Sequence, residues 1–264
     1  MSLRIFSLAI LITLPTMFCR AQNMVADYQL INVNDKHAAY ENPQLQKELQ
    51  KAHKKLAKRI DVVIGYCPEK MISEKPQSPL SNFLTDILVE IANEYCQKHH
   101  KEAVDFSILN FGGIRAPLHA GNITIGDLFE IAPFENNMAI AEIKGSELRK
   151  LFQRFKVKSC EPYSKQVTIK YAGDYFFQAL IHDQEIDNDK IYRVATLDFI
   201  LTGGDGIFKG IEIINADMTK INIRNAYINH IKKMTSEGKN VTGKNDKRMS
   251  IIPQPRWLWK DSLA

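Results

Sequence analysis

The chain has 264 residues, of which 45% are hydrophobic and 25% charged, and this composition excludes disordered and fibrous proteins. The formal net charge of +5 becomes +3 when the first 21 residues, with Arg4 and Arg20 and no acidic residue, are removed. This balance lacks the strong basic excess of nucleic-acid-binding proteins, but it is compatible with a small anionic ligand.

The first 21 residues have the pattern of a secretory signal peptide. Arg4 precedes an apolar run, residues 5–14, that is shorter than the about 20 residues of a membrane-spanning helix. Small residues at Cys19 and Ala21 predict cleavage after Ala21, and therefore an exported chain in the periplasm or at the cell surface. A buried N-terminal helix is one alternative. A lipid anchor on Cys19 is another, which Phe18 directly before it disfavours. No second apolar segment is long enough to span a membrane.

The next two segments differ in their periodicity. Residues 22–41 show little periodicity and are predicted to form an extended arm. Residues 42–59 are predicted to form a helix, because apolar residues recur at helical spacing through Leu45, Leu49 and Leu56. Five lysines surround them, which indicates a solvated face rather than a binding site.

Residues 60–257 are predicted to form the main domain, in which helix and strand patterns are mixed. Strands are expected at residues 60–65, 104–110, 138–143, 167–171, 175–181 and 192–197. Helices are expected from Ser78 through Tyr95 and at residues 126–131, 145–155 and 222–233, and residues 234–248 are expected to form a polar loop. This mixture predicts an α/β or α+β fold with mixed sheets flanked by helices.

Two glycine-containing loops follow predicted strands and are candidate binding sites. In the first, residues 110–115, the pair Gly112-Gly113 allows close approach of a ligand to the backbone, and Arg115 can bind a phosphate or carboxylate. In the second, residues 202–206, glycines flank Asp205, whose carboxylate can accept hydrogen bonds from ribose hydroxyl groups. Taken singly, each loop is more often a tight turn than a site.

Common catalytic motifs are absent from the sequence. It contains no GxGxxG, GxxxxGK[ST], HExxH or GxSxG pattern, and its seven histidines form no cluster with carboxylates along the chain. His99-His100 is expected to end a helix. The three cysteines after residue 21 allow at most one disulfide within the chain. These observations predict a binding domain without a catalytic centre or metal site of its own.

Four segments, in the same order, resemble the motifs of the C-terminal domain of 5'-nucleotidases. Residues 110–115 (NFGGIR) resemble the family's N-G-G-G-I-R, and residues 81–86 (SNFLTD) its helix start. Residues 121–134 (GNITIGDLFEIAPF) resemble the stretch before P-F-G-N, and residues 192–206 (YRVATLDFILTGGDG) the block that ends in G-G-D-G. The resemblance covers residues 42–252 and implies the fold of that domain.

The resemblance implies a binding site for a nucleoside monophosphate or a related nucleotide. Two phenylalanines, Phe134 and Phe199, would sandwich the base, and Asp205 would hold the ribose. Asn136 would reach the base edge, while Asn110 and Arg115 would serve the ribose and phosphate side. The site residues expected in this way are Asn110, Gly112, Gly113, Arg115, Phe134, Asn136, Phe199, Gly204 and Asp205.

The departures from the family pattern concern the phosphate side. Phe111 stands where N-G-G-G-I-R has its first glycine, and Glu135 stands where P-F-G-N has its glycine. The carboxylate of Glu135 would disfavour a nearby phosphate. The family's preceding domain supplies two divalent metals through motifs that this chain lacks. The resemblance therefore implies a separate metallophosphoesterase subunit, with residues 42–59 resembling the linker between the two domains. A nucleoside-binding module without catalysis is the alternative, and a scaffold with a decayed site is a third.

Overall fold

The computed structural model describes residues 42–246 and 248–253. The expected signal peptide, the arm at residues 22–41 and the last residues of the main domain, 254–257, lie outside the described residues. The chain divides into two compact units after Leu49. The sheets formed by the described residues all belong to the second unit.

Helix α1, Pro43–Ile60, confirms the helix expected at residues 42–59. Its start follows from local chemistry, because the Asn42 side-chain oxygen accepts hydrogen bonds from the backbone N–H groups of Gln44 and Leu45. The strand expected from residue 60 begins later than predicted. The helix continues through Ile60, and strand β1 covers only Val63–Cys67.

The first four-stranded sheet has the order β2-β8-β4-β9 and carries the candidate loops. Its strands are β2, Phe106–Ser107; β8, Ile191–Leu197; β4, Asn137–Lys144; and β9, Asn215–Asn222. Strand β4 pairs antiparallel with both β8 and β9, whereas β2 pairs parallel with β8. Strand β4 confirms the strand expected at residues 138–143, and four consecutive residues from Met138 are buried, as in a strand covered on both faces.

The other two sheets complete the second unit. In the sheet β10-β5-β6-β7, the C-terminal strand β10 pairs parallel with β5. The strands of this sheet are β5, Val167–Ala172; β6, Tyr175–Ile181; β7, Gln184–Glu185; and β10, Met249–Ile252. Strands β1 and β3, Gly121–Thr124, form an antiparallel pair. Parallel and antiparallel pairs thus occur together, as the expected mixed α/β fold requires.

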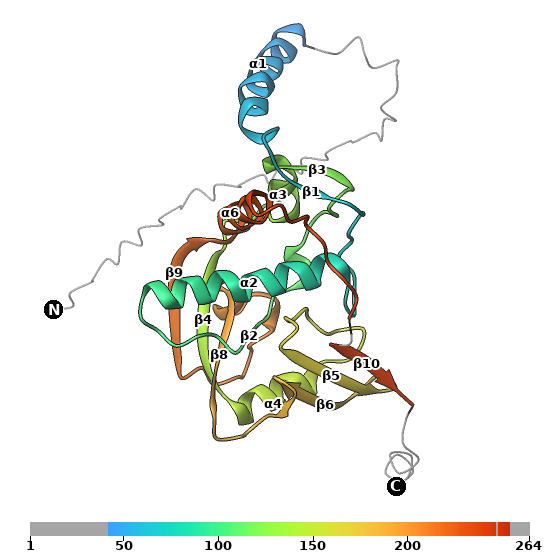
Figure 1. Ribbon diagram of the computed structural model, residues 1–264, viewed down its shortest axis with the longest axis vertical. Coiled ribbons are helices and arrows are strands. Elements are labelled where there is room, and N and C mark those ends of the chain that lie inside the picture. The colour runs from blue at the N-terminus through green and yellow to red at the C-terminus, as the bar shows by residue number, and fades with distance from the viewer. Residues whose placement is uncertain (1–41, 247, 254–264) are drawn as a thin grey trace, which may run out of the picture. The chain divides into compact units, whose positions relative to one another are not determined.

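Helices flank each sheet (Figure 1). Helices α3, Ile125–Ile131, and α6, Ile223–Ser236, contact the β1–β3 pair, while α4, Gly145–Arg154, contacts β4 and β6. Helix α2, Pro79–Lys98, contacts β2 and β8. It starts where expected, because Ser78 and Ser81 form a capping box, and it ends at His99 as predicted.

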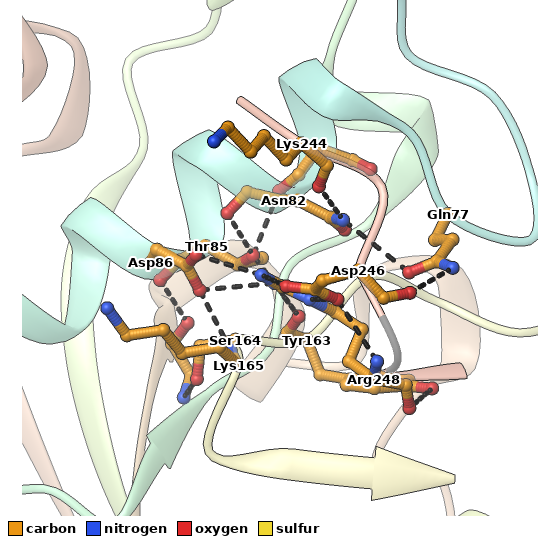
Figure 2. Close-up of polar contacts among 12 residues, drawn as sticks. Gln77, Asn82, Thr85, Asp86, Tyr163, Ser164, Lys165, Lys244, Asp246 and Arg248 are labelled. Carbon is orange, nitrogen blue, oxygen red and sulfur yellow. Dashed lines mark hydrogen bonds and ion pairs between the residues drawn. The ribbon is translucent and has the colours of Figure 1, made fainter. Parts of the chain in front are cut away.

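A buried arginine joins the C-terminal segment to α2. Figure 2 shows Arg248 between two carboxylates, with Asp86 Oδ2 2.9 Å and Asp246 Oδ2 2.7 Å from its Nη2 atom. It also donates a hydrogen bond of 2.9 Å to the backbone carbonyl of Tyr163. Burial raises the pKa of Asp246, but the hydrogen bonds from Arg248 outweigh it and hold that pKa below its usual value. We call Arg248, Asp86 and Asp246 the C-terminal clasp.

The three described cysteines are all free and buried, so the disulfide that the sequence allowed does not form between them. Burial raises the pKa of each thiol above its usual value, in Cys160 to about 12. Because the thiolate is the reactive form, these thiols are unsuited to nucleophilic catalysis. All three side chains pack in the hydrophobic core.

Candidate nucleoside site

The first candidate loop begins sooner than the sequence predicted. The strand expected at residues 104–110 is reduced to β2 and an isolated bridge between Ile108 and Tyr163. A single 3-10 turn, Phe111–Gly113, follows Asn110. Asn110 is only 4% exposed, so the sheet and the turn fix its amide where the strand ends.

The second candidate loop lies in a segment after β8 that contains two short helical turns. Helix α5, Asp198–Leu201, carries Phe199, and a 3-10 turn, Gly204–Gly206, carries Asp205. The glycine-rich loop expected at residues 202–206 therefore contains a 3-10 turn. Asp205 adopts a left-handed backbone conformation with φ of 54°, which aspartate tolerates better than most residues, and its side chain is exposed.

The two loops meet through their polar side chains. The Nδ2 atom of Asn110 donates a hydrogen bond of 2.6 Å to Oδ2 of Asp205, across 95 positions of sequence. A Cβ atom at Gly112 would lie 3.3 Å from the same oxygen. The second loop therefore lies directly against the first, and the ribose-binding residue implied by the resemblance shares a hydrogen bond with another residue of the expected site.

Gly113 is required by the packing of Asn110. A Cβ atom at position 113 would lie 2.7 Å from Oδ1 of Asn110, closer than nonbonded atoms approach. That oxygen is buried and has no hydrogen-bond partner among the described protein atoms. A buried acceptor without a partner costs free energy, so Oδ1 is suited to a hydrogen bond from a ligand or a water molecule.

Phe134 and Asn136 lie on the segment between α3 and β4 and line a cavity together with Asn110 and Gly113. Its volume is about 30 Å³, which is enough to hold a water molecule. Its other walls are mainly aliphatic, and they also include Tyr227. Four of the expected site residues are thus brought to one place in the structure.

Neither phenylalanine belongs to the hydrophobic core. Phe134 is 48% exposed and Phe199 is 42% exposed, so neither ring is packed into the core. The Phe199 ring packs on Gly204, where an added Cβ atom would lie 2.4 Å from a ring carbon. Gly204 is thus needed for the position of the ring.

The residues that depart from the family pattern have partners of their own. Lys75 lies 5.5 Å from the centre of the Phe111 ring and forms an ion pair of 3.2 Å with Glu161. Glu135 forms an ion pair with Arg224, so its charge is compensated close by. This pairing weakens the repulsion of a phosphate that the sequence predicted for Glu135. Arg115 is exposed and donates a hydrogen bond of 3.2 Å to the carbonyl of Gly112.

Sequence reasoning missed two residues that border this region. Asp198 sits in the Y-R-V-A-T-L-D-F block, directly before Phe199, and Arg224 lies in the first turn of α6. Asp198 was recognisable by its neighbour in the motif. Arg224 gave no signal, because it is 89 positions away from its partner Glu135.

The described residues offer no metal site. No group of three histidine, cysteine, aspartate or glutamate side chains lies close enough within residues 42–246 and 248–253 to hold a metal ion. Their donor groups therefore do not fit the pair of divalent metals that the resemblance implies for phosphate-ester hydrolysis. No helix in this part of the chain is long and apolar enough to cross a membrane.

The family model for the C-terminal domain of 5'-nucleotidases matches residues 63–211, more than half of the chain. The chain belongs to the 5'-nucleotidase C-terminal domain family. This match includes both candidate loops and the segment that carries Phe134 and Asn136.

Individual relatives agree with this assignment. Protein UshA of Yersinia enterocolitica is 33% identical over 110 residues, which cover 40% of this chain and 20% of UshA. The trifunctional nucleotide phosphoesterase protein YfkN of Bacillus subtilis is 27% identical over 192 residues, covering 65% of this chain and 13% of YfkN. The crystal structure of a 5'-nucleotidase precursor from Thermus thermophilus shows the same fold, with a TM-score of 0.64 at 18% sequence identity. The superposition covers 80% of this chain and 43% of the Thermus thermophilus chain. The chain spans at most a fifth of the length of the two curated relatives.

Proposed function

We propose that this domain binds the nucleoside part of a nucleotide and presents its phosphate ester to the catalytic centre of an exported 5'-nucleotidase-type hydrolase. A separate metallophosphoesterase subunit supplies that centre with its two divalent metals. The observation that supports the proposal most directly is the 2.6 Å hydrogen bond between Asn110 and Asp205, which joins the two loops that the family motifs mark.

Five of the expected residues would contact the ligand directly in this proposal. The exposed faces of Phe134 and Phe199 stack on the base, and such stacking is worth about 1–3 kcal/mol per base. The exposed carboxylate of Asp205 accepts hydrogen bonds from the ribose hydroxyl groups. Arg115 is exposed on the neighbouring loop and binds the phosphate side. Asn136 borders the same cavity as Phe134 and reaches the base edge.

The metallophosphoesterase subunit docks through α1 in this proposal. Leu56 on that helix is 52% exposed, and basic residues surround its apolar positions. An apolar stripe between lysines fits a partner surface that is apolar with an acidic rim. Co-purification of candidate metallophosphoesterases with the full chain, and with a variant that lacks residues 42–59, tests this point. Equal capture by both forms would exclude α1 as the docking element.

Calorimetric titration of the purified chain with adenosine, adenosine 5'-monophosphate and ribose 5-phosphate tests the binding function. We expect both adenine compounds to bind, the monophosphate more tightly, and ribose 5-phosphate to bind weakly because it has no base to stack. Phe134→Ala and Phe199→Ala should each weaken binding about 5-fold to 150-fold, the equivalent of losing one stacking face. Binding that both variants leave unchanged would exclude the site.

The same titration separates the hydrolase role from the alternative of a nucleoside-binding module. Tighter binding of adenosine than of its monophosphate favours the module. An assay of phosphate release from the monophosphate with divalent metal tests the need for a partner. Substantial turnover by this chain alone, abolished by Phe134→Ala, would refute the separate subunit.

A further inference from the structure

Arg224 holds the segment that carries Phe134. Its Nη1 atom donates hydrogen bonds to the backbone carbonyls of Ala132, at 3.0 Å, and of Phe134, at 3.4 Å. Its Nη2 atom donates to the carboxylate of Glu135. The Arg224 side chain is only 5% exposed, and its guanidinium carbon lies 4.0 Å from the centre of the Phe129 ring. One buried side chain thus fixes the backbone on both sides of Pro133.

Asp198 joins the same segment to the helix that carries Phe199. Its Oδ1 atom accepts hydrogen bonds from the backbone N–H groups of Asn137, at 3.0 Å, and of Phe199, at 2.8 Å. Its Oδ2 atom accepts from the side chain of Asn137 at 2.9 Å. The carboxylate therefore connects the residue after Asn136 to the backbone of Phe199, across 61 positions of sequence.

Further contacts tie the segment to the start of α6. The backbone N–H of Ile223 donates a hydrogen bond of 3.0 Å to the carbonyl of Asn136. Asn222, the N-cap of α6, donates one of 2.9 Å to Glu135. The backbone of residues 132–137 is thus held from α6 on one side and from α5 on the other, while the Phe134 ring itself stays exposed.

We propose that Arg224 and Asp198 are positioning residues that set the separation and orientation of Phe134 and Phe199 before a ligand binds. This inference rests on the proposed function, because it assigns a role to residues around the same site. Two exposed rings on separate turns would have to be ordered when a base binds, at a cost in affinity. The hydrogen bonds of Arg224 and Asp198 order their backbones in advance, so less binding free energy is spent on ordering.

The test is a double-mutant cycle measured by calorimetry with adenosine 5'-monophosphate. Arg224→Met removes the hydrogen bonds and keeps much of the side-chain volume, and it should weaken binding about tenfold, a part of one stacking contribution. In the Phe134→Ala background the same substitution should weaken binding by less than about twofold, because the ring it positions is gone. Arg224→Lys retains a charge beside Glu135 but not the forked geometry, and its affinity should fall between those of wild type and Arg224→Met.

Arg248→Met is the matched control, since it removes another buried arginine whose partners do not line the cavity beside Phe134. It should lower the melting temperature at least as much as Arg224→Met and leave affinity within about twofold of wild type, as expected for sites that do not share partners. Asp198→Asn, a milder change, should weaken binding measurably and provides the test if Arg224→Met does not fold.

The outcomes separate the two proposals. If wild-type protein binds the nucleotide while Arg224→Met and Asp198→Asn bind equally well, the positioning role is overturned and the binding site stands. If Arg224→Met lowers the nucleotide affinity equally in the wild-type and the Phe134→Ala backgrounds, its effect is a general structural one. This result also overturns the positioning role. If wild-type protein does not bind at all, the proposed function itself fails.

Discussion

Two buried arginines, Arg248 and Arg224, hold different regions of this domain, and their partners differ in kind. Arg248 contacts two carboxylates and one backbone carbonyl in the C-terminal clasp, which joins the residues before β10 to α2. Arg224 contacts one largely exposed carboxylate, 75% accessible, and two backbone carbonyls of a turn beside an exposed aromatic ring. Both arginine side chains are nearly inaccessible to solvent.

This difference indicates what each arginine contributes. The Asp86 carboxylate of the clasp is only 22% exposed, so removal of Arg248 would leave a partly buried charge without its cationic partner. Glu135 can be solvated by water when Arg224 is absent. The clasp therefore mainly stabilises the fold, whereas Arg224 mainly sets the geometry of a surface segment.

The largest expected effect is on stability. Arg248→Met should lower the free energy of unfolding by about 2–4 kcal/mol, because two carboxylates lose their cationic partner and the Tyr163 carbonyl loses one of its hydrogen bonds. Arg224→Met should cost about 1–2 kcal/mol, since its carboxylate partner returns to water. Urea denaturation followed by circular dichroism measures both values. If Arg224→Met lowered the free energy of unfolding more than Arg248→Met does, Arg224 rather than the clasp would be the main stabilising arginine.

The next effect is on ligand affinity. Gly204→Ala would place a Cβ atom 2.4 Å from the Phe199 ring, which must then turn away. Because the ring is exposed, stability should change little, while nucleotide binding weakens by about 1 kcal/mol or more, a part of one stacking contribution. Calorimetry and thermal denaturation of the same preparation measure the two quantities. Undiminished affinity would show that the Phe199 face is not used.

The smallest effect concerns His230, which lies on the same helix as Arg224 and borders the same pocket as the clasp. Burial lowers its pKa below 6.5, although neighbouring carboxylates oppose the shift. The charged residues that face it are Glu90, Glu94, Lys233 and Glu237. The unfolded chain therefore takes up this proton at a higher pH than the native protein does, and stability is lost as the pH falls from 6.5 through the native pKa.

His230→Gln should remove this part of the pH dependence. Unfolding free energies of wild type and variant are measured in urea on both sides of pH 6.5. The difference between them should stay constant above 6.5, and wild type should lose stability relative to the variant as the pH falls from there through the native pKa of His230. Parallel curves for the two proteins throughout the range would contradict the assigned shift.

The sequence predicted the elements whose ends depend on nearby residues. Helix α2 starts at its Ser78 cap, and α6 follows Asn222, whose side chain accepts a hydrogen bond from the Asn225 backbone. These signals lie within one helical turn of the boundary, so a local pattern suffices to find them. The two glycine loops were found in the same way.

The missed features depend on residues far apart in the chain. Strand β10 exists because residues 249–252 pair with β5, and β9 because it pairs with β4. The strand expected at residues 104–110 is short because its later residues turn toward other partners, as the bridge from Ile108 to Tyr163 shows. Periodicity within one segment carries no record of such pairings. The role of Arg224 was hidden for the same reason, because its partner Glu135 is 89 positions away.

The most direct test of the central claim is a crystal structure of the domain with adenosine 5'-monophosphate bound. We expect the adenine to lie between the rings of Phe134 and Phe199, with the ribose hydroxyl groups within hydrogen-bond distance of Asp205. A base bound elsewhere on the molecule, with both rings left exposed to solvent, would contradict it.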